Sequence, residues 1–360
     1  MSKTTNTRGS DFKAKLLATA SGAALMMAVC ASQPAIAADS DHSVVWIELG
    51  GEFTQLGNSQ EPYLPPFVLG NSRLPFITES PATTERPAAT SADGMAKISL
   101  QPAGSDWTFS AAIRFGRNSK DRISDQRTAQ RTPTNYNFVE YNAYQNLSAK
   151  NSESHMILDF SAGKDVGLGK FGSGGSSAVD FGVRYAQLES RNLTNIAYQP
   201  TNANIFDYYP VYRFYGTFAA ARKFTGIGPS LSWDASAALA GNSQDGEITL
   251  DWGVNGAVLF GHQQVRGHHR TAKNEVYYSG TLYKVQIYQT PASINRSRQV
   301  VVPNLGGFAG LSWRYPNAKV SIGYRTDFFF NAIDGGLDTR KEEDRSFYGP
   351  FASISIGIGD

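Results

Sequence analysis

The sequence has little cysteine, little charge and no long hydrophobic run beyond its first 37 residues. A single cysteine among 360 residues excludes a disulfide scaffold and a cysteine-based zinc cluster. Charged residues make up 18% of the chain, against about 25% in an ordinary soluble domain. The formal net charge of +2 gives no electrostatic drive toward nucleic acid. Because no apolar run of about 18 residues follows the N-terminal segment, no transmembrane helix is expected there.

Residues 1–37 have the parts of a secretory signal peptide. A basic start is followed by an apolar stretch from Leu16 to Ala31 and by the small-residue cleavage site Ala35-Ile36-Ala37. The sequence therefore predicts a cleaved segment over 1–37 and a single domain over 38–360. Cys30 leaves a lipoprotein signal as a less favoured alternative.

The rest of the chain alternates between apolar and polar residues with a period of two. Between Trp107 and Gly116, for example, every second residue is aromatic or aliphatic, and the residues between them are polar or small. Such alternation is typical of strands with one apolar and one polar face. It predicts ten strands, over 44–56, 94–101, 107–117, 154–163, 178–188, 219–240, 247–262, 305–315, 318–328 and 347–359.

The predicted connections alternate between long, polar segments and short ones. The long segments are 57–93, 118–153, 189–218, 263–304 and 329–346; the short or glycine-rich segments are 102–106, 164–177, 241–246 and 316–317. Long extracellular loops and short periplasmic turns are typical of outer-membrane barrels. The sequence therefore predicts an all-β fold, a closed antiparallel transmembrane β-barrel of about ten strands (range roughly 8–12) in a Gram-negative outer membrane. A soluble secreted β-protein is the alternative.

The two faces of the predicted strands carry different residues. Aromatic residues expected at the membrane interfaces form a girdle of Phe53, Trp107, Phe115, Tyr185, Phe260, Trp313, Tyr315 and Phe328. The opposite face points into the lumen and carries the charges Glu48, Glu52, Arg114, Asp159, Asp180, Arg184, Asp234, Asp251, Arg314, Lys319, Arg325 and Asp327. These charges fit either a constriction that sorts solutes or a salt-bridge network that fills the lumen.

Three other features bear on possible chemistry. His262, His268 and His269 share one stretch, but their spacing is no known metal-ligand pattern, so a solvated basic loop is favoured. His155 and Asp159 are four residues apart on one strand face, about 13 Å, which is beyond hydrogen-bond reach. The glycines of 167–172 precede no helix, which favours a turn over a nucleotide site. The sequence predicts no enzyme, cofactor or metal site.

The segment 118–153 begins beside Arg117 and is rich in basic residues. A solvated loop edge is the favoured interpretation, and contact with lipopolysaccharide phosphate is the alternative. Outer-membrane lipid, lipopolysaccharide and the barrel-assembly machinery are the expected partners, nucleic acid is not, and a homo-oligomer is left open.

Three short blocks are rich in glycine and aromatic residues: Phe224–Pro229, Tyr324–Phe330 followed by Asp334-Gly335-Gly336, and Phe347–Phe351. These blocks resemble the Legionella-type major outer membrane protein family of pore-forming barrels. The blocks cover the C-terminal third best, and the N-terminal half matches mainly in layout. The resemblance implies a passive pore or a structural barrel without catalytic residues. The chain ends Ile358-Gly359-Asp360 where many outer-membrane barrels end on an aromatic residue, which leaves its assembly signal open.

The expected function is a passive pore for small hydrophilic solutes with a charged lumen. The alternative is a structural or adhesive barrel with a closed lumen, whose long surface loops bind a partner.

Overall fold

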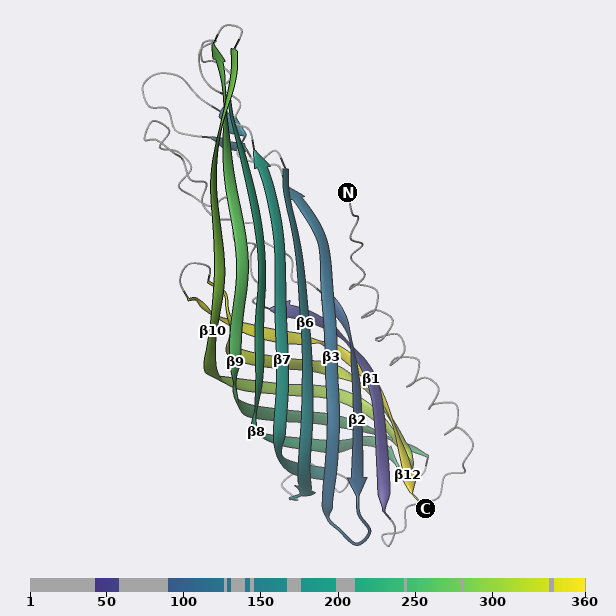
Figure 1. Cartoon of the computed structure of the whole chain (residues 1–360). Coiled ribbons are helices and arrows are strands. Elements are labelled where there is room, and N and C mark those ends of the chain that lie inside the picture. The colour runs from purple at the N-terminus through teal and green to yellow at the C-terminus, as the bar shows by residue number, and fades with distance from the viewer. Residues whose placement is uncertain are drawn as a thin grey trace, which may run out of the picture.

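The computed structural model describes residues 43–57, 90–125, 128–130, 140–142, 146–166, 176–198, 211–242, 245–279, 282–336 and 340–359. Within these residues, ten strands form one closed antiparallel barrel and two short strands form a separate sheet (Figure 1). The barrel strands are β1 (Val44–Gly57), β2 (Thr90–Gln101), β3 (Trp107–Asp125), β6 (Asn146–Asp165), β7 (Ser176–Tyr198), β8 (Val211–Asn242), β9 (Gly246–Ser279), β10 (Leu282–Tyr315), β11 (Ala318–Asp334) and β12 (Glu342–Gly359). The separate pair is β4 (Thr128–Gln130) and β5 (Glu140–Asn142). Among the described residues, no helix has the length and apolarity needed to span a bilayer.

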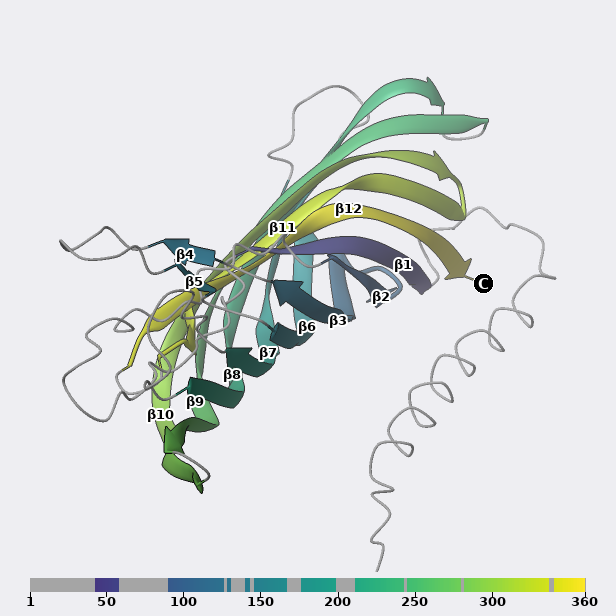
Figure 2. The same ribbon diagram turned by 90° about the horizontal axis from the view of Figure 1, so that it is seen from above.

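The barrel closes through β1, which lies between β12 and β2 (Figure 2). Val44 pairs with Gly359 on β12 and with Gln101 on β2. Since each strand runs antiparallel to its neighbours, β1 begins and β12 ends at the same end of the barrel, which we call the short-turn end. The predicted all-β, ten-stranded antiparallel barrel is confirmed.

The short-turn end is built from tight connections. Residues 316–317 join β10 to β11, and 102–106 join β2 to β3. The turn from β8 into β9 places Gly246 at φ 117°, where a side chain would also meet the Trp313 ring. The predicted turn 164–177 is bounded by the ends of β6 and β7, and its glycine motif at 167–172 lies outside the described residues.

Most of the predicted loop 263–304 is strand, so that prediction was wrong. β9 continues to Ser279 and β10 begins at Leu282, with an unbroken register from Leu282↔Ser279 to Arg314↔Glu247. The loops predicted over 189–218 and 118–153 are likewise shortened, because β7, β8, β3 and β6 extend into them. Outside the membrane neither face of a strand meets lipid, so an extended strand there has no need of apolar alternation.

The extended parts of β8, β9 and β10 form a surface ribbon, defined here as residues 211–224, 263–279 and 282–298. In Figure 1 the hairpin of β9 and β10 rises beyond the rest of the barrel, and β7 runs beside β8 up to the pair of Tyr198 with Phe214. From Phe260 to Ser279, β9 extends for about 60 Å at about 3.3 Å per residue. On the inner side of the ribbon Phe218 is fully buried and Ile294 packs against it. The ribbon is therefore a packed continuation of the barrel wall.

Candidate functional site

Large apolar side chains cover the outer surface of the barrel. Phe181 is 62% exposed, Ile322 59% and Val254 51%. Other exposed members of this belt are Ile98, Phe109, Phe160, Ile227, Leu231, Leu250, Leu305, Leu311, Val320, Ile354 and Ile356. A soluble monomer rarely exposes an apolar patch beyond a few hundred Å². The belt matches the lipid-facing band of an outer-membrane barrel, in which every backbone group pairs within the closed sheet.

The aromatic residues proposed for the girdle lie toward the two ends of this belt. At the short-turn end Trp107, Trp313 and Tyr315 are exposed, and the last two rings stack with centroids 5.8 Å apart. At the other end Phe53, Phe115, Phe260 and Phe328 are exposed, and we call them the outer aromatic residues. Tyr185 is only half-buried. Their placement at lipid headgroups stays a prediction.

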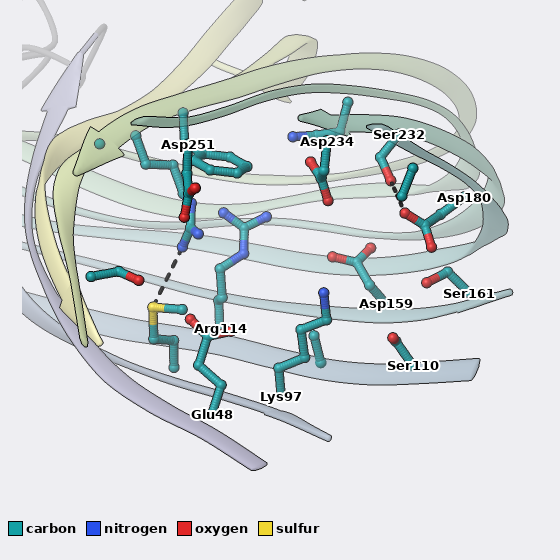
Figure 3. Close-up of a pocket in the computed structure, with 18 of the residues that line it drawn as sticks. Glu48, Lys97, Ser110, Arg114, Asp159, Ser161, Asp180, Ser232, Asp234 and Asp251 are labelled. Carbon is teal, nitrogen blue, oxygen red and sulfur yellow. Dashed lines mark hydrogen bonds between the residues drawn. The ribbon is translucent and has the colours of Figure 1, made fainter. Parts of the chain in front are cut away.

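A cavity of about 320 Å³ occupies the lumen near the short-turn end (Figure 3). Ten of the twelve predicted lumen charges line it: Glu48, Arg114, Asp159, Asp180, Arg184, Asp234, Asp251, Arg314, Lys319 and Arg325. The other two, Glu52 and Asp327, line a much smaller space beside it. Serine side chains from several strands, among them Ser110, Ser161 and Ser232, complete the wall. Whether these charges sort solutes stays a prediction.

Ion pairs cross the lumen at one end of this cavity. Arg114 forms an ion pair with Asp327, although the two lie on β3 and β11. Arg184 Nε is 2.6 Å from Asp159 Oδ1, and Arg184 Nη1 donates to Asn255 Oδ1 at 2.7 Å. Arg184 Nη1 is also 4.0 Å from Asp327 Oδ1. These side chains bridge opposite walls and narrow the lumen.

Two further cations of the lumen, Arg325 and Lys319, are also paired with carboxylates. The guanidinium of Arg325 lies 3.8 Å from Glu52 Oε2, and its Cζ is 4.8 Å from the ring centroid of Phe351. Lys319 Nζ is 2.5 Å from Asp251 Oδ2, which also accepts a hydrogen bond from Ser312 at 2.6 Å. Most lumen charges therefore have a partner of opposite sign. This arrangement is the salt-bridge network that was one of the two alternatives predicted from the sequence for these charges.

His155 faces the lumen, but its partner is Asp93 on β2. His155 Nε2 lies 3.4 Å from Asp93 Oδ2, and Thr54 donates a hydrogen bond to the same carboxylate. Gly116 makes this approach possible, because a Cβ there would lie 1.8 Å from Asp93 Oδ1. The Phe347 ring covers the imidazole at a centroid distance of 4.2 Å. The pair is thus enclosed within the barrel.

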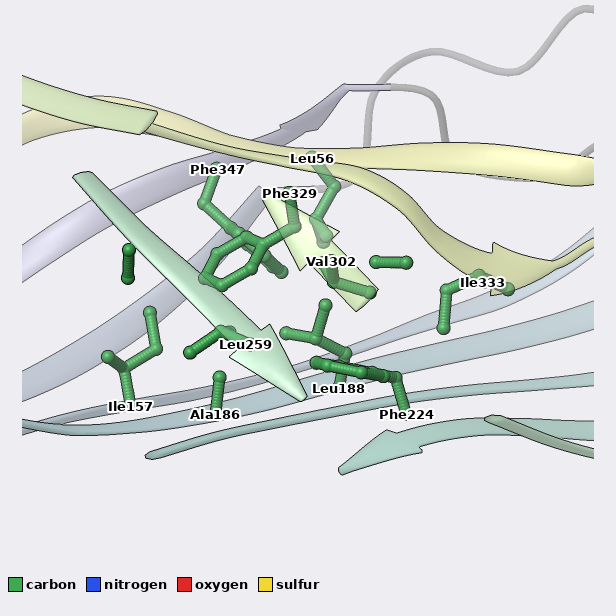
Figure 4. Packing of buried hydrophobic residues seen from close by; sticks show 12 residues of the cluster. Leu56, Ile157, Ala186, Leu188, Phe224, Leu259, Val302, Phe329, Ile333 and Phe347 are labelled. Atoms are coloured by element: carbon green, nitrogen blue, oxygen red, sulfur yellow. The ribbon is translucent and has the colours of Figure 1, made fainter. Parts of the chain in front are cut away.

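A cluster of buried apolar side chains fills the lumen beyond the ion pairs (Figure 4). We call it the apolar plug, and it consists of Leu56, Ile157, Ala186, Leu188, Phe224, Ala257, Leu259, Val302, Phe329, Ala332, Ile333 and Phe347. Phe224, Leu259, Val302 and Phe329 have no exposed surface. Register places the base of the plug against the ion pairs, because Ile157 pairs with Arg114 and Phe347 with Asp327.

A polar cluster lies above the plug, past the level of the outer aromatic residues. Arg345, 1% exposed, is 3.7 Å from Glu153 Oε2 and 3.5 Å from Glu343 Oε2. Burial raises the pKa of the Glu153 carboxyl above its ordinary value, and the charge of Arg345 opposes that shift. Burial also lowers the pKa of Arg222 to about 10. The plug is therefore bounded on both sides by buried ionisable side chains.

The plug was not predicted from the sequence, although a signal for it was present. Adjacent residues such as Leu259-Phe260 and Phe328-Phe329 are both apolar, so both faces of the strand are apolar at that height. One side chain of each pair is exposed on the belt and the other is buried in the lumen. The Asp93 partner of His155 was also missed, because cross-strand register cannot be read from local spacing.

The predicted histidine loop is not a loop. His262 and His268 lie on β9, both exposed, and the His269 side chain lies outside the described residues. Among the described residues, no group of three His, Cys, Asp or Glu side chains is placed to hold a metal ion.

The closed barrel and its apolar belt define an outer-membrane β-barrel protein. The chain belongs to the family described as the Legionella pneumophila major outer membrane protein precursor, whose family model matches residues 105–358. The predicted family is thereby confirmed, and the family and fold place the chain in the outer membrane. A search of the curated proteins found no match.

Solved structures with a similar course of the chain are outer-membrane proteins of low identity. The outer membrane protease OmpT from Escherichia coli is 11% identical, with a TM-score of 0.35, over 90% of this chain and 99% of that one. A major outer membrane protein from Thermus thermophilus is 10% identical, with a TM-score of 0.26, over 88% and 99%. The P. putida toluene transporter TodX is 9% identical, with a TM-score of 0.19, over 89% and 90%. None of these likenesses bears on the function of this chain.

Proposed function

We propose that this chain is an outer-membrane barrel with a closed lumen, whose function lies in the surface ribbon outside the membrane. The apolar plug is the observation that carries this proposal. Twelve side chains from strands around the barrel meet in the lumen, and several have no exposed surface. A hydrated solute would have to displace them, because a packed apolar cluster offers no hydrogen-bond partners to replace lost water.

The ion pairs beneath the plug strengthen the barrier. Arg114 and Arg184 reach Asp327 from two other strands, so the lumen is bridged by side chains. Breaking a buried ion pair by removing one partner costs about 3–5 kcal/mol, which disfavours thermal opening at this level. A barrel closed twice along its axis is suited to structural support or to binding at its outer end.

A passive pore is the second candidate, and the charged cavity favours it. The cavity of about 320 Å³ carries both acidic and basic side chains, which is typical of a selectivity region. The pore requires a second conformation in which the plug side chains leave the lumen axis. In that case Arg114 and Arg325 are the residues proposed to set ion preference.

The proposal includes no catalytic role. The His155–Asp93 pair lies under Phe347, and the His155 side chain is only 8% exposed. A substrate would have no path to the imidazole while the plug and the ion pairs are in place.

Liposome swelling tests this proposal. The folded full chain is reconstituted into liposomes loaded with an impermeant polymer, which are then diluted into isosmotic arabinose. We expect no swelling above that of protein-free liposomes. Swelling at a rate proportional to the protein content would reject the closed lumen, and R114A/R325A would then test the pore, whose ion preference should change.

A further inference from the structure

A patch of basic side chains lies on the outward face of the barrel wall, past the outer aromatic residues. We define the basic patch as Arg117, Lys150, Arg191, Lys223, Arg266 and His268, contributed by β3, β6, β7, β8 and β9. All six are exposed or half-exposed. Among the described residues that line the lumen cavity or form the apolar plug, none of the six appears.

Register places these side chains on one face. Arg191 pairs with Ala221, and Ala221 pairs with Arg266, so the two arginines flank a small residue at a spacing of about 10 Å. Two residues further along β8 and β9, His268 pairs with Ala219 on the same face. Their sequence neighbours Asn192, Arg222 and Val265 are buried on the other face, which confirms that the patch points outward.

The height of the patch follows from the end of the apolar belt. On β9 the last belt residue is Phe260, and Arg266 lies six residues beyond it. On β8 Lys223 lies four residues past Ile227, and on β3 Arg117 lies two past Phe115. At about 3.3 Å per residue, and allowing for strand tilt, these charges stand roughly 5–15 Å above the hydrocarbon edge. That is the level of lipid headgroups and the first sugars attached to them.

The patch surrounds a shallow groove. The groove has a volume of about 530 Å³ and is lined by Lys150, Arg191, Arg266 and His268 around Ala219, Ala221, Gly267 and the exposed Leu193. The small side chains in the floor leave room for a headgroup between the cations. The groove is therefore a partly apolar hollow rimmed by positive charge.

The charges of the patch are largely available. Arg191 pairs with Glu189 at 2.5 Å, yet its side chain remains 63% exposed. Within the described ranges, no carboxylate lies at ion-pair distance from Lys150, Lys223 or Arg266, although Glu189 stands opposite Lys223 in the register. The patch is also one-sided, because the outward positions Asn295, Ser297 and Gln299 on the next strand, β10, are neutral. A general attraction to anionic membrane would not require such confinement.

We propose that the basic patch binds the phosphorylated headgroup of an outer-leaflet glycolipid of the lipopolysaccharide type. Guanidinium groups bind phosphate through paired, charge-assisted hydrogen bonds, and the two arginines are spaced to contact separate phosphates. The glycolipid is favoured over phospholipid because it occupies the outer leaflet, where the patch lies, and carries several phosphates on one sugar headgroup. The proposal holds whether or not the lumen conducts.

The test measures binding of fluorescently labelled lipopolysaccharide to the folded full chain in nonionic detergent. R191A/R266A removes two charges from the groove, and we expect affinity to fall about tenfold. R340A/K341A is the matched control, because it also removes two exposed charges from the outer end of the barrel, away from the groove. For this control we expect less than a twofold change. Equal losses in both variants, or none in the first, would overturn the proposal.

Three further arms identify the ligand. Lipopolysaccharide stripped of phosphate should bind R191A/R266A and the unaltered chain equally weakly. Millimolar inorganic phosphate should leave most of the labelled glycolipid bound; complete displacement would indicate a simple anion site and reject the glycolipid. Phosphatidylglycerol micelles that compete as well as unlabelled lipopolysaccharide would likewise reject it.

Discussion

The adjacent residues Phe328 and Phe329 provide the sharpest test of the apolar plug. Phe328 is 40% exposed on the belt, whereas Phe329 is fully buried in the lumen. Substituting each by alanine removes the same atoms from two different environments. Lipid chains refill the space beside residue 328, but nothing refills the space left by residue 329 if the plug is packed and dry.

The magnitude follows from these environments. Both substitutions lose a transfer free energy of about 1.5–3 kcal/mol. F329A also leaves an unfilled volume of roughly 100 Å³, which adds about 2 kcal/mol at about 24 cal/mol per Å³. We therefore expect F329A to lower the free energy of unfolding by about 3–5 kcal/mol. F328A should lower it by about 2 kcal/mol less than F329A does.

The assay is reversible urea unfolding of the full chain in lipid vesicles, followed by tryptophan fluorescence. The slope of the transition should be the same for both variants, so that their midpoints report stability. Equal effects of F328A and F329A would refute the reasoning, because they would show that the lumen at this height is filled by water or is able to collapse.

Three other predictions follow. D327N should destabilise the barrel by about 3–5 kcal/mol in the same urea assay, because Arg114 and Arg184 would lose a shared buried anion; a loss below about 1 kcal/mol would show that these cations are hydrated. G116A should lower the free energy of unfolding by about 1–3 kcal/mol, because the added Cβ would displace the Asp93 carboxylate. The control G256A should lower it by less, because its Cβ would meet its nearest atom only at 3.6 Å. Equal effects of the two substitutions would contradict the close approach of Gly116 to Asp93. Burial raises the folded pKa of Glu153 above its unfolded value, so the stability that its protonated form contributes is present below about pH 4.5 and is lost as the pH rises through the folded pKa. Urea midpoints from pH 4 to pH 8 should therefore fall for the unaltered chain relative to E153Q, and parallel profiles would show that Glu153 is hydrated.

Much of the fold is predictable from the sequence because lipid imposes a simple rule. Each crossing strand must present apolar side chains outward at every second residue, and segments such as Trp107–Phe115 show that pattern plainly. The rule ends with the membrane. The β9 and β10 parts of the ribbon meet water or their own packed interior, so their sequences lack the alternation, and they fall within the predicted loop 263–304.

The contents of the lumen were only partly predictable. The alternation that identifies the outward belt residues also predicts that charges such as Arg114 and Asp327 point inward. In the structure both side chains line the lumen. Which charge meets which depends on register between strands far apart in the sequence. The plug depends on register as well, because Leu259 and Phe329 come together only when the barrel closes.

Planar-bilayer conductance of the folded full chain tests the central claim most directly. With the plug and the ion pairs in place, the account predicts insertion without discrete current steps, verified by protection of the inserted barrel from added protease. Repeatable unitary steps from the unaltered chain would contradict it, since they require a continuous water path through the lumen that the apolar plug fills.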